Sequence, residues 1–92
     1  MNMTEKTIIL GDEYDENLRN TINLVLKNNN AVSLGKSWGV GGSQEIEEIK
    51  MKLGNEIITI EAETFIGITI KGTSSVVENI AQQVRNQLPI KN

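Results

Sequence analysis

The feature that most constrains the fold is a strict alternation of apolar and charged residues over Glu48–Leu53. A period of two is typical of a β-strand with one buried face. Gly54-Asn55 follows directly and favours a two-residue hairpin turn. With this turn the apolar residues of two antiparallel strands meet on one face, so pattern and turn agree on the register. The predicted pairs are Leu53 with Glu56, Met51 with Ile58 and Ile49 with Ile60.

A second hairpin is predicted in the same way, by asking which loop length places the apolar residues of both strands on one face. A two-residue turn at Glu63-Thr64 would put the apolar residues of the two strands on opposite faces, whereas a three-residue loop at Glu63-Thr64-Phe65 keeps them together. We therefore expect the three-residue loop, with Phe65 at its tip. The predicted pairs are Ala62 with Ile66, Ile60 with Ile68 and Ile58 with Ile70.

A helix is predicted after the last of these strands. Ser75 and Glu78 have the spacing of a capping box. Apolar residues then recur at helical spacing over residues 77–88, which predicts one apolar face. Residues 45–88 are therefore expected to form a three-stranded antiparallel meander covered by an amphipathic helix.

The preceding part of the chain is predicted to contribute two strands and a helix. Lys6–Leu10 and Ala31–Leu34 are rich in β-compatible residues. Between them, apolar side chains at helical spacing predict a helix from about Glu13 to Lys27 or Asn28. The predicted buried stripe of this helix consists of Tyr14, Leu18, Ile22, Val25 and Leu26.

Together these elements predict an α+β fold in the order β-α-β-β-β-β-α. The sheet is expected to be mostly antiparallel, with both helices packed on one face. A chain of 92 residues has the length of one domain, so we expect a single domain over residues 1–92. Residues 1–4 are expected to be disordered. The pattern leaves open the strand order and the place of the Lys6–Leu10 strand in the sheet.

Composition disfavours catalysis. The chain has no cysteine and no histidine, so it lacks a thiol nucleophile and the commonest general base. No motif places a serine beside a base. We therefore expect no enzymatic activity, no catalytic residue and no cofactor. No apolar run is long enough to cross a membrane, and the first residues lack the pattern of a signal peptide. We expect a cytoplasmic protein without a membrane partner.

Charge disfavours nucleic acid and metal ions. The net charge of −3 provides no general attraction for phosphate backbones, so we expect no nucleic-acid partner. Four acidic residues lie close together in the sequence: Asp12, Glu13, Asp15 and Glu16. They lack the ligand spacing and central glycine of a calcium-binding loop. Negative charge at this point favours the start of a helix instead, so we expect no metal site.

A glycine-rich segment, Gly35–Ser43, is predicted to be a loop inside the domain. Its first residues, Gly35-Lys36-Ser37, invite comparison with a phosphate-binding P-loop. Asn30 stands where that motif needs its first glycine, and the following glycines cannot open a helix. The alternative left open is a looser nest of backbone N–H groups around an anion, with Lys36 beside it.

Trp38, within this segment, has two interpretations. Large aromatic residues usually pack, so we favour a strand connection in which Trp38 covers an open edge of the core. If Trp38 is exposed instead, it becomes the best single anchor for a partner protein, because tryptophan is enriched at interface hot spots.

The leading functional hypothesis is a small protein-binding module, such as an adaptor, a regulator or an immunity-type inhibitor, whose partner is another protein. Its candidate contact residues are Lys36, Trp38, Val40 and the loop-tip Phe65. One alternative is a homo-oligomeric structural protein, joined through an exposed strand edge or through Leu24, Ile57 and Val76. Another is a binder of a small anion or ligand through Gly35–Ser43.

Overall fold

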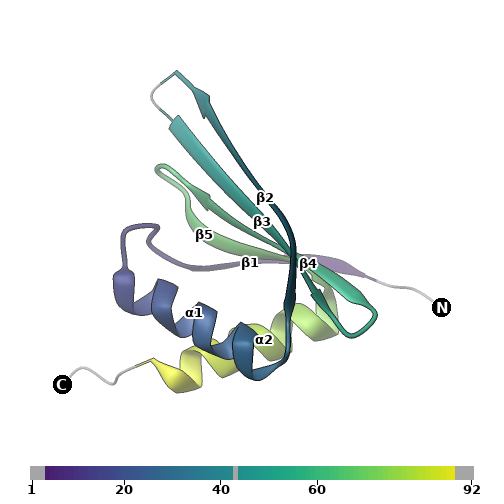
Figure 1. Ribbon diagram of the computed structural model, residues 1–92. Coiled ribbons are helices and arrows are strands. Elements are labelled where there is room, and N and C mark those ends of the chain that lie inside the picture. Colours follow the sequence, from purple (N-terminus) through teal and green to yellow (C-terminus); the bar gives the residue numbers. More distant parts are fainter. Residues whose placement is uncertain (1–3, 43, 89–92) are drawn as a thin grey trace.

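The computed structural model describes residues 4–42 and 44–88, and these form one antiparallel sheet with two helices on one of its faces (Figure 1). The elements are β1 (Glu5–Gly11), α1 (Glu16–Asn28), β2 (Val32–Gly41), β3 (Gln44–Leu53), β4 (Glu56–Glu63), β5 (Gly67–Thr73) and α2 (Ser74–Gln87). This order confirms the predicted α+β fold. Of the segment predicted to be disordered, residues 1–3 lie outside the described part, and the carbonyl of Thr4 accepts a hydrogen bond from Ser74 N at 2.7 Å.

The five strands are arranged in the order β1-β5-β4-β3-β2, so the N-terminal strand lies beside the last one. This answers the question of strand order that the pattern left open. β1 and β2 form the two edges of the sheet. Among the described residues, no helix is long and apolar enough to cross a membrane.

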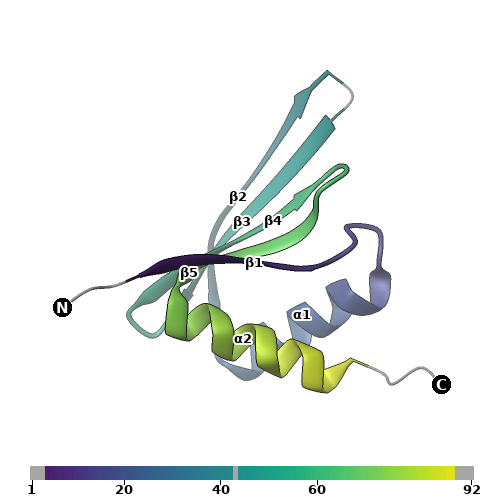
Figure 2. The ribbon, with the colours of Figure 1, turned by 180° about the vertical axis from the view of Figure 1, so that it is seen from behind.

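The core lies where the helices cover β5 and β4. Its buried members come from α1, β4, β5 and α2: Leu18, Ile22, Val25, Leu26, Ile58, Ile60, Ile68, Ile70, Val77, Ile80 and Val84. α2 packs on β1 and β5, and α1 packs on α2. In contrast, the described side chains of β2 are all exposed, and those of β3 are at most half-buried. The β2–β3 hairpin extends away from the helices in both views (Figure 1, Figure 2).

The first predicted hairpin is confirmed in its register. Leu53 pairs with Glu56, Met51 with Ile58 and Ile49 with Ile60. Gly54 has a φ of 58°, a left-handed conformation that glycine adopts without steric cost. Turn chemistry and side-chain pattern therefore determine this pairing together.

The second predicted hairpin has the wrong register. β4 pairs with β5 through Glu63–Gly67, Ala62–Ile68 and Ile60–Ile70, so the loop is Thr64–Ile66, and Ile66 is exposed rather than inward-facing. Thr64, the first residue of the loop, donates its N–H to Glu45 O of β3 at 3.0 Å. Gly67 then begins β5 at a φ of 111°, where a Cβ would lie 2.3 Å from the carbonyl oxygen of Gly11. Phe65 does lie at the loop tip, as predicted, with a φ of 72°.

The prediction of a glycine-rich loop at Gly35–Ser43 is also wrong. Gly35–Gly41 continue β2, and only Gly42 and Ser43 separate this strand from β3. Ser43 lies outside the described residues. The reason is that glycine lacks a side chain but keeps both backbone groups, so it pairs with β3 when a long partner strand is available. β3 provides that partner because it begins at Gln44.

Both helices begin at residues other than those predicted, whereas α1 ends where it was expected to end. α1 begins three residues later than expected, with Asp15 as its N-cap, so Tyr14 precedes the helix and is exposed rather than part of the buried stripe. α2 begins at Ser74, and the predicted Ser75–Glu78 capping box is replaced by a hydrogen bond from Ser74 Oγ to Glu78 Oε2 at 2.8 Å. α1 ends as expected in asparagines, with Asn29 as the C-cap and Asn30 at a φ of 59°.

The acidic group before α1 bonds to backbone N–H groups. Asp15 Oδ1 accepts from Leu18 N at 3.0 Å, which is the usual N-cap bond. Asp12 Oδ1 accepts from Tyr14 N at 2.8 Å. Glu13 Oε2 accepts from Phe65 N at 3.0 Å and so ties the β4–β5 loop to the start of the helix.

Candidate functional site

Over Gly35–Gly41, β2 presents its larger side chains on the inner face of the sheet. Lys36 pairs with Ile49 and Trp38 pairs with Glu47, on the face where Ile49 meets the buried Ile60. Paired residues of antiparallel strands point to the same side, and alternate residues of one strand share a face. Lys36, Trp38 and Val40 therefore form one row on the part of the inner face that the helices leave uncovered. Three of the four predicted contact residues are brought together in this way.

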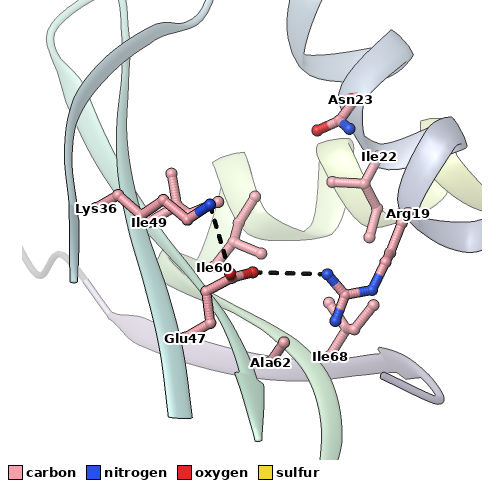
Figure 3. A pocket seen from close by; sticks show the side chains of 9 residues that line it. All are labelled: Arg19, Ile22, Asn23, Lys36, Glu47, Ile49, Ile60, Ala62 and Ile68. Atoms are coloured by element: carbon pink, nitrogen blue, oxygen red, sulfur yellow. Dashed lines mark ion pairs between the residues drawn. The ribbon is translucent and has the colours of Figure 1, made fainter. Parts of the chain in front are cut away.

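A groove runs between α1 and this uncovered part of the sheet (Figure 3). Its centre is a hollow of about 200 Å³ lined by Arg19, Ile22, Asn23, Lys36, Glu47, Ile49, Ile60, Ala62 and Ile68. A larger hollow of about 470 Å³ adjoins it and continues toward Lys27, Asn30 and Met51. A smaller hollow of about 110 Å³ adjoins the other end and reaches Tyr14 and Trp38. The floor is mostly aliphatic, and the polar side chains stand along the rim.

Glu47 lies between two cations, one from α1 and one from β2 (Figure 3). Its Oε1 is 3.5 Å from the Nη1 atom of Arg19, and its Oε2 is 3.4 Å from the Nζ atom of Lys36. Arg19 also donates from Nε to the carbonyl of Glu13 at 2.6 Å. Exposed ion pairs contribute at most about 1 kcal/mol each, so these two add little to stability; they link α1, β2 and β3 around the hollow.

Arg19 and Glu47 were not among the site residues predicted from the sequence. Glu47 breaks the apolar pattern of the inner face two residues before Ile49, and the expected alternation began only at Glu48. A charged residue at a position that the alternation predicts to face inward could have indicated a site. Arg19 carried no such signal, because it is adjacent to the buried Leu18 and reads as an ordinary solvated helix residue.

The aromatic residues of the chain gather at one end of the groove. The sequence contains one tyrosine, one tryptophan and one phenylalanine. Tyr14, Trp38 and Phe65 are 76%, 64% and 80% exposed. Tyr14 and Trp38 line the small hollow at the groove end, and Tyr14 and Phe65 line the next hollow. Both hollows share Glu13, Tyr14 and Thr64, so we define the aromatic end as Tyr14, Trp38 and Phe65 around these residues.

The exposure of Trp38 decides between its two interpretations. The favoured one, in which Trp38 covers an edge of the core, is wrong, because the side chain is 64% exposed. The other, an exposed anchor, is consistent with the structure. Val40 lies farther along the same face and is also exposed.

The alternative of an anion nest in a Gly35–Ser43 loop loses its geometric basis. A nest needs successive N–H groups that converge on one point. In β2 the chain is extended over Gly35–Gly41, so successive N–H groups point to opposite edges of the strand. Within residues 4–42 and 44–88, no three carboxylates lie close enough together to hold a metal ion.

A pair of carboxylates lies on the outer face of the sheet, opposite the groove. Glu61 pairs directly with Glu48 across β4 and β3. Partial burial, a hydrogen bond with Glu48 and the negative charges of Glu48 and Glu63 raise the pKa of Glu61, while Lys71 opposes this shift. Elsewhere, the hydrogen bond from Ser74 and the nearby Lys6 lower the pKa of Glu78. Neither carboxyl group belongs to the groove.

Comparison of the chain with models of known protein families, with curated proteins and with solved structures found no match. The case for a function therefore depends on the geometry and chemistry of the groove. Its central hollow is lined by aliphatic side chains, one amide and three ion-paired residues, a composition suited to recognition of another surface.

Proposed function

We propose that this protein is a non-catalytic protein-binding module, and that the groove and its aromatic end form the binding surface. The observation that supports this most is that Tyr14, Trp38 and Phe65 are all exposed and gathered on one side of the molecule. An aromatic side chain can bury about 150–250 Å² of surface, and tryptophan and tyrosine are enriched among residues that dominate interface energies. Exposure of these three side chains to water is unfavourable, and burial against a partner would remove that cost.

The rest of the groove supports the same role. The apolar floor at Ile49 and Ile60 is flanked by Arg19, Lys36 and Glu47, and an apolar centre with a polar rim is the usual anatomy of a protein interface. In this proposal the module works in the cytoplasm as an adaptor, regulator or immunity-type inhibitor, and its partner is another protein.

Capture of partners from cells with Trp38→Ala and a matched control tests the proposal. Ile57→Ala is the control, because Ile57 is also exposed and apolar but lies on the outer face of β4. We expect Trp38→Ala to weaken partner binding by about 30-fold, as for a hot-spot residue worth about 2 kcal/mol, and Ile57→Ala to leave it unchanged. Thermal melts should show that both variants stay folded. A partner list that is the same for wild type and Trp38→Ala would contradict the proposal.

A further inference from the structure

The free edge of β2 is the second feature of the molecule that calls for a partner. β2 spans ten residues at the margin of the sheet. Alternate residues of an edge strand direct their N–H and C=O groups away from the sheet, which makes the edge a template for another strand. Over Gly35–Gly41 it carries a single charge, that of Lys36, and Glu47 pairs with that charge. The opposite edge, β1, differs because Glu5 and Lys6 are charged and α2 packs against the strand.

The outer face of β2 is almost bare. Gly35, Ser37 and Gly39 alternate with the inward-facing side chains, so the outer face carries one hydroxyl group over this stretch. A Cβ added at Gly35 or Gly39 would meet nothing within 4 Å. Glycine inside a strand often marks a place where another backbone approaches closely, and here no side chain obstructs such an approach.

We propose that β2 pairs antiparallel with β2 of a second copy, around a two-fold axis at Ser37, so that the two sheets become one. An axis at Ser37 places Lys36 of each copy opposite Trp38 of the other on the inner face, which sets a cation beside an aromatic ring twice. Gly35 of each copy then meets Gly39 of the other on the bare outer face. Ser37 also lies within Gly35–Gly41, the part of β2 that pairs with β3 without a register shift.

Neighbouring registers are less favourable. Residues that pair directly across two antiparallel strands must lie on the same face of the sheet. A two-fold axis between two copies of β2 must therefore pass through a position where one residue pairs with its own copy. An axis at Lys36 would put two lysines directly opposite each other, which is destabilising. An axis at Trp38 would face each Lys36 with Val40, which provides no contact between a cation and an aromatic ring.

This dimer would widen the groove into a shared cleft. The helices leave β3 and β2 of each copy uncovered. In the dimer these four strands would lie side by side in the order β3-β2-β2-β3. At about 4.8 Å per strand, the two β3 strands would lie about 15 Å apart, with α1 of each copy forming a wall. The pairing is made mainly by backbone groups at the edge, but Lys36 and Trp38 would take part in both the dimer and the proposed binding surface. Self-association and partner capture are therefore measured by separate assays.

Single cysteines test the register directly, because the chain has no cysteine of its own. Ser37→Cys would place two thiols on the axis, and cross-strand Cα distances of about 4.5–5.5 Å permit a disulfide. Gly39→Cys is the matched control, since it lies on the same face but would be separated from its copy by about 13 Å along the strand. Under mild oxidation we expect at least about ten times more crosslinked dimer for Ser37→Cys than for Gly39→Cys.

Light scattering of wild type across a range of concentrations tests the association itself. We expect a dimer that dissociates on dilution, since a short strand pairing is a small interface. A wild-type chain that stays monomeric up to about 1 mM overturns the proposal whatever the crosslinking shows. Equal crosslinking of the two cysteine variants, or more for Gly39→Cys, overturns it as well. Neither result would bear on partner capture by Trp38, which concerns the other proposal.

Discussion

Gly67 begins β5, and its replacement by alanine is the sharpest test of how the β4–β5 hairpin is built. The residue has a φ of 111°, a conformation that side chains other than glycine rarely adopt. A Cβ there would lie 2.3 Å from the carbonyl oxygen of Gly11 and 3.3 Å from its carbonyl carbon. Both contacts are with backbone at the end of β1, which cannot move aside as a flexible side chain could.

The expected cost follows from these two terms. A residue held in a sparsely populated backbone region costs about 1–3 kcal/mol, and forcing extra volume into a packed site typically costs about 1–3 kcal/mol more. Gly67→Ala should therefore lower the free energy of unfolding by about 2–6 kcal/mol, against a net stability of about 5–15 kcal/mol for a domain. For a chain of this size the melting temperature should fall by at least about 10 °C.

Thermal and urea unfolding of Gly67→Ala and Gly39→Ala measure this difference. Gly39 is the matched control, because it is also a strand glycine but has open space where a Cβ would stand. Gly39→Ala should leave stability unchanged or raise it by up to about 1 kcal/mol. If Gly67→Ala melts within about 3 °C of wild type, the close approach of β5 to Gly11, and with it the observed register, would be refuted.

Two further predictions concern charged residues. Protonated Glu61 stabilises the fold below its unfolded pKa, and this stability is lost as pH rises through its raised folded pKa. Glu61→Gln should therefore raise the free energy of unfolding by about 0.5 kcal/mol at pH 7, where it removes repulsion from Glu48, and by almost nothing near pH 4; urea titrations that give the same gain at both pH values would contradict this. Asp15→Ala should cost about 1 kcal/mol by removing the N-cap bond to Leu18 N, while Asp15→Asn keeps most of it. Equal melting temperatures for the two Asp15 variants would show that this cap contributes nothing.

Features of the fold that depend on neighbouring residues could be predicted from the sequence. The alternation in Glu48–Leu53 and the turn at Gly54-Asn55 determine the β3–β4 register, since side-chain parity and turn geometry are both local. The asparagines after α1 determine where that helix ends, because asparagine tolerates the left-handed conformation seen at Asn30. Of the candidate site, Lys36, Trp38, Val40 and Phe65 were chosen from residue type and an irregular context, and all are exposed.

Features that depend on contacts between distant segments were decided by the tertiary structure. The β4–β5 register is set by the approach of Gly67 to Gly11, which nothing in residues 56–73 reveals. Whether Gly35–Gly41 form a loop or a strand depends on β3 being long enough to pair with them, because glycine itself favours neither. Tyr14 fits the helical spacing of α1, yet the Asp15 cap starts the helix after it and leaves it in water.

The meander of β3, β4 and β5 is therefore only part of the sheet. Period-two patterning determined its strands and its inner face, because burial of one face is encoded residue by residue. The pattern could not show that the two helices leave β2 and β3 uncovered, since coverage depends on how elements pack rather than on any one of them. That uncovered half brings Arg19, Lys36, Trp38 and Glu47 together, and it is where the proposed function of this protein lies.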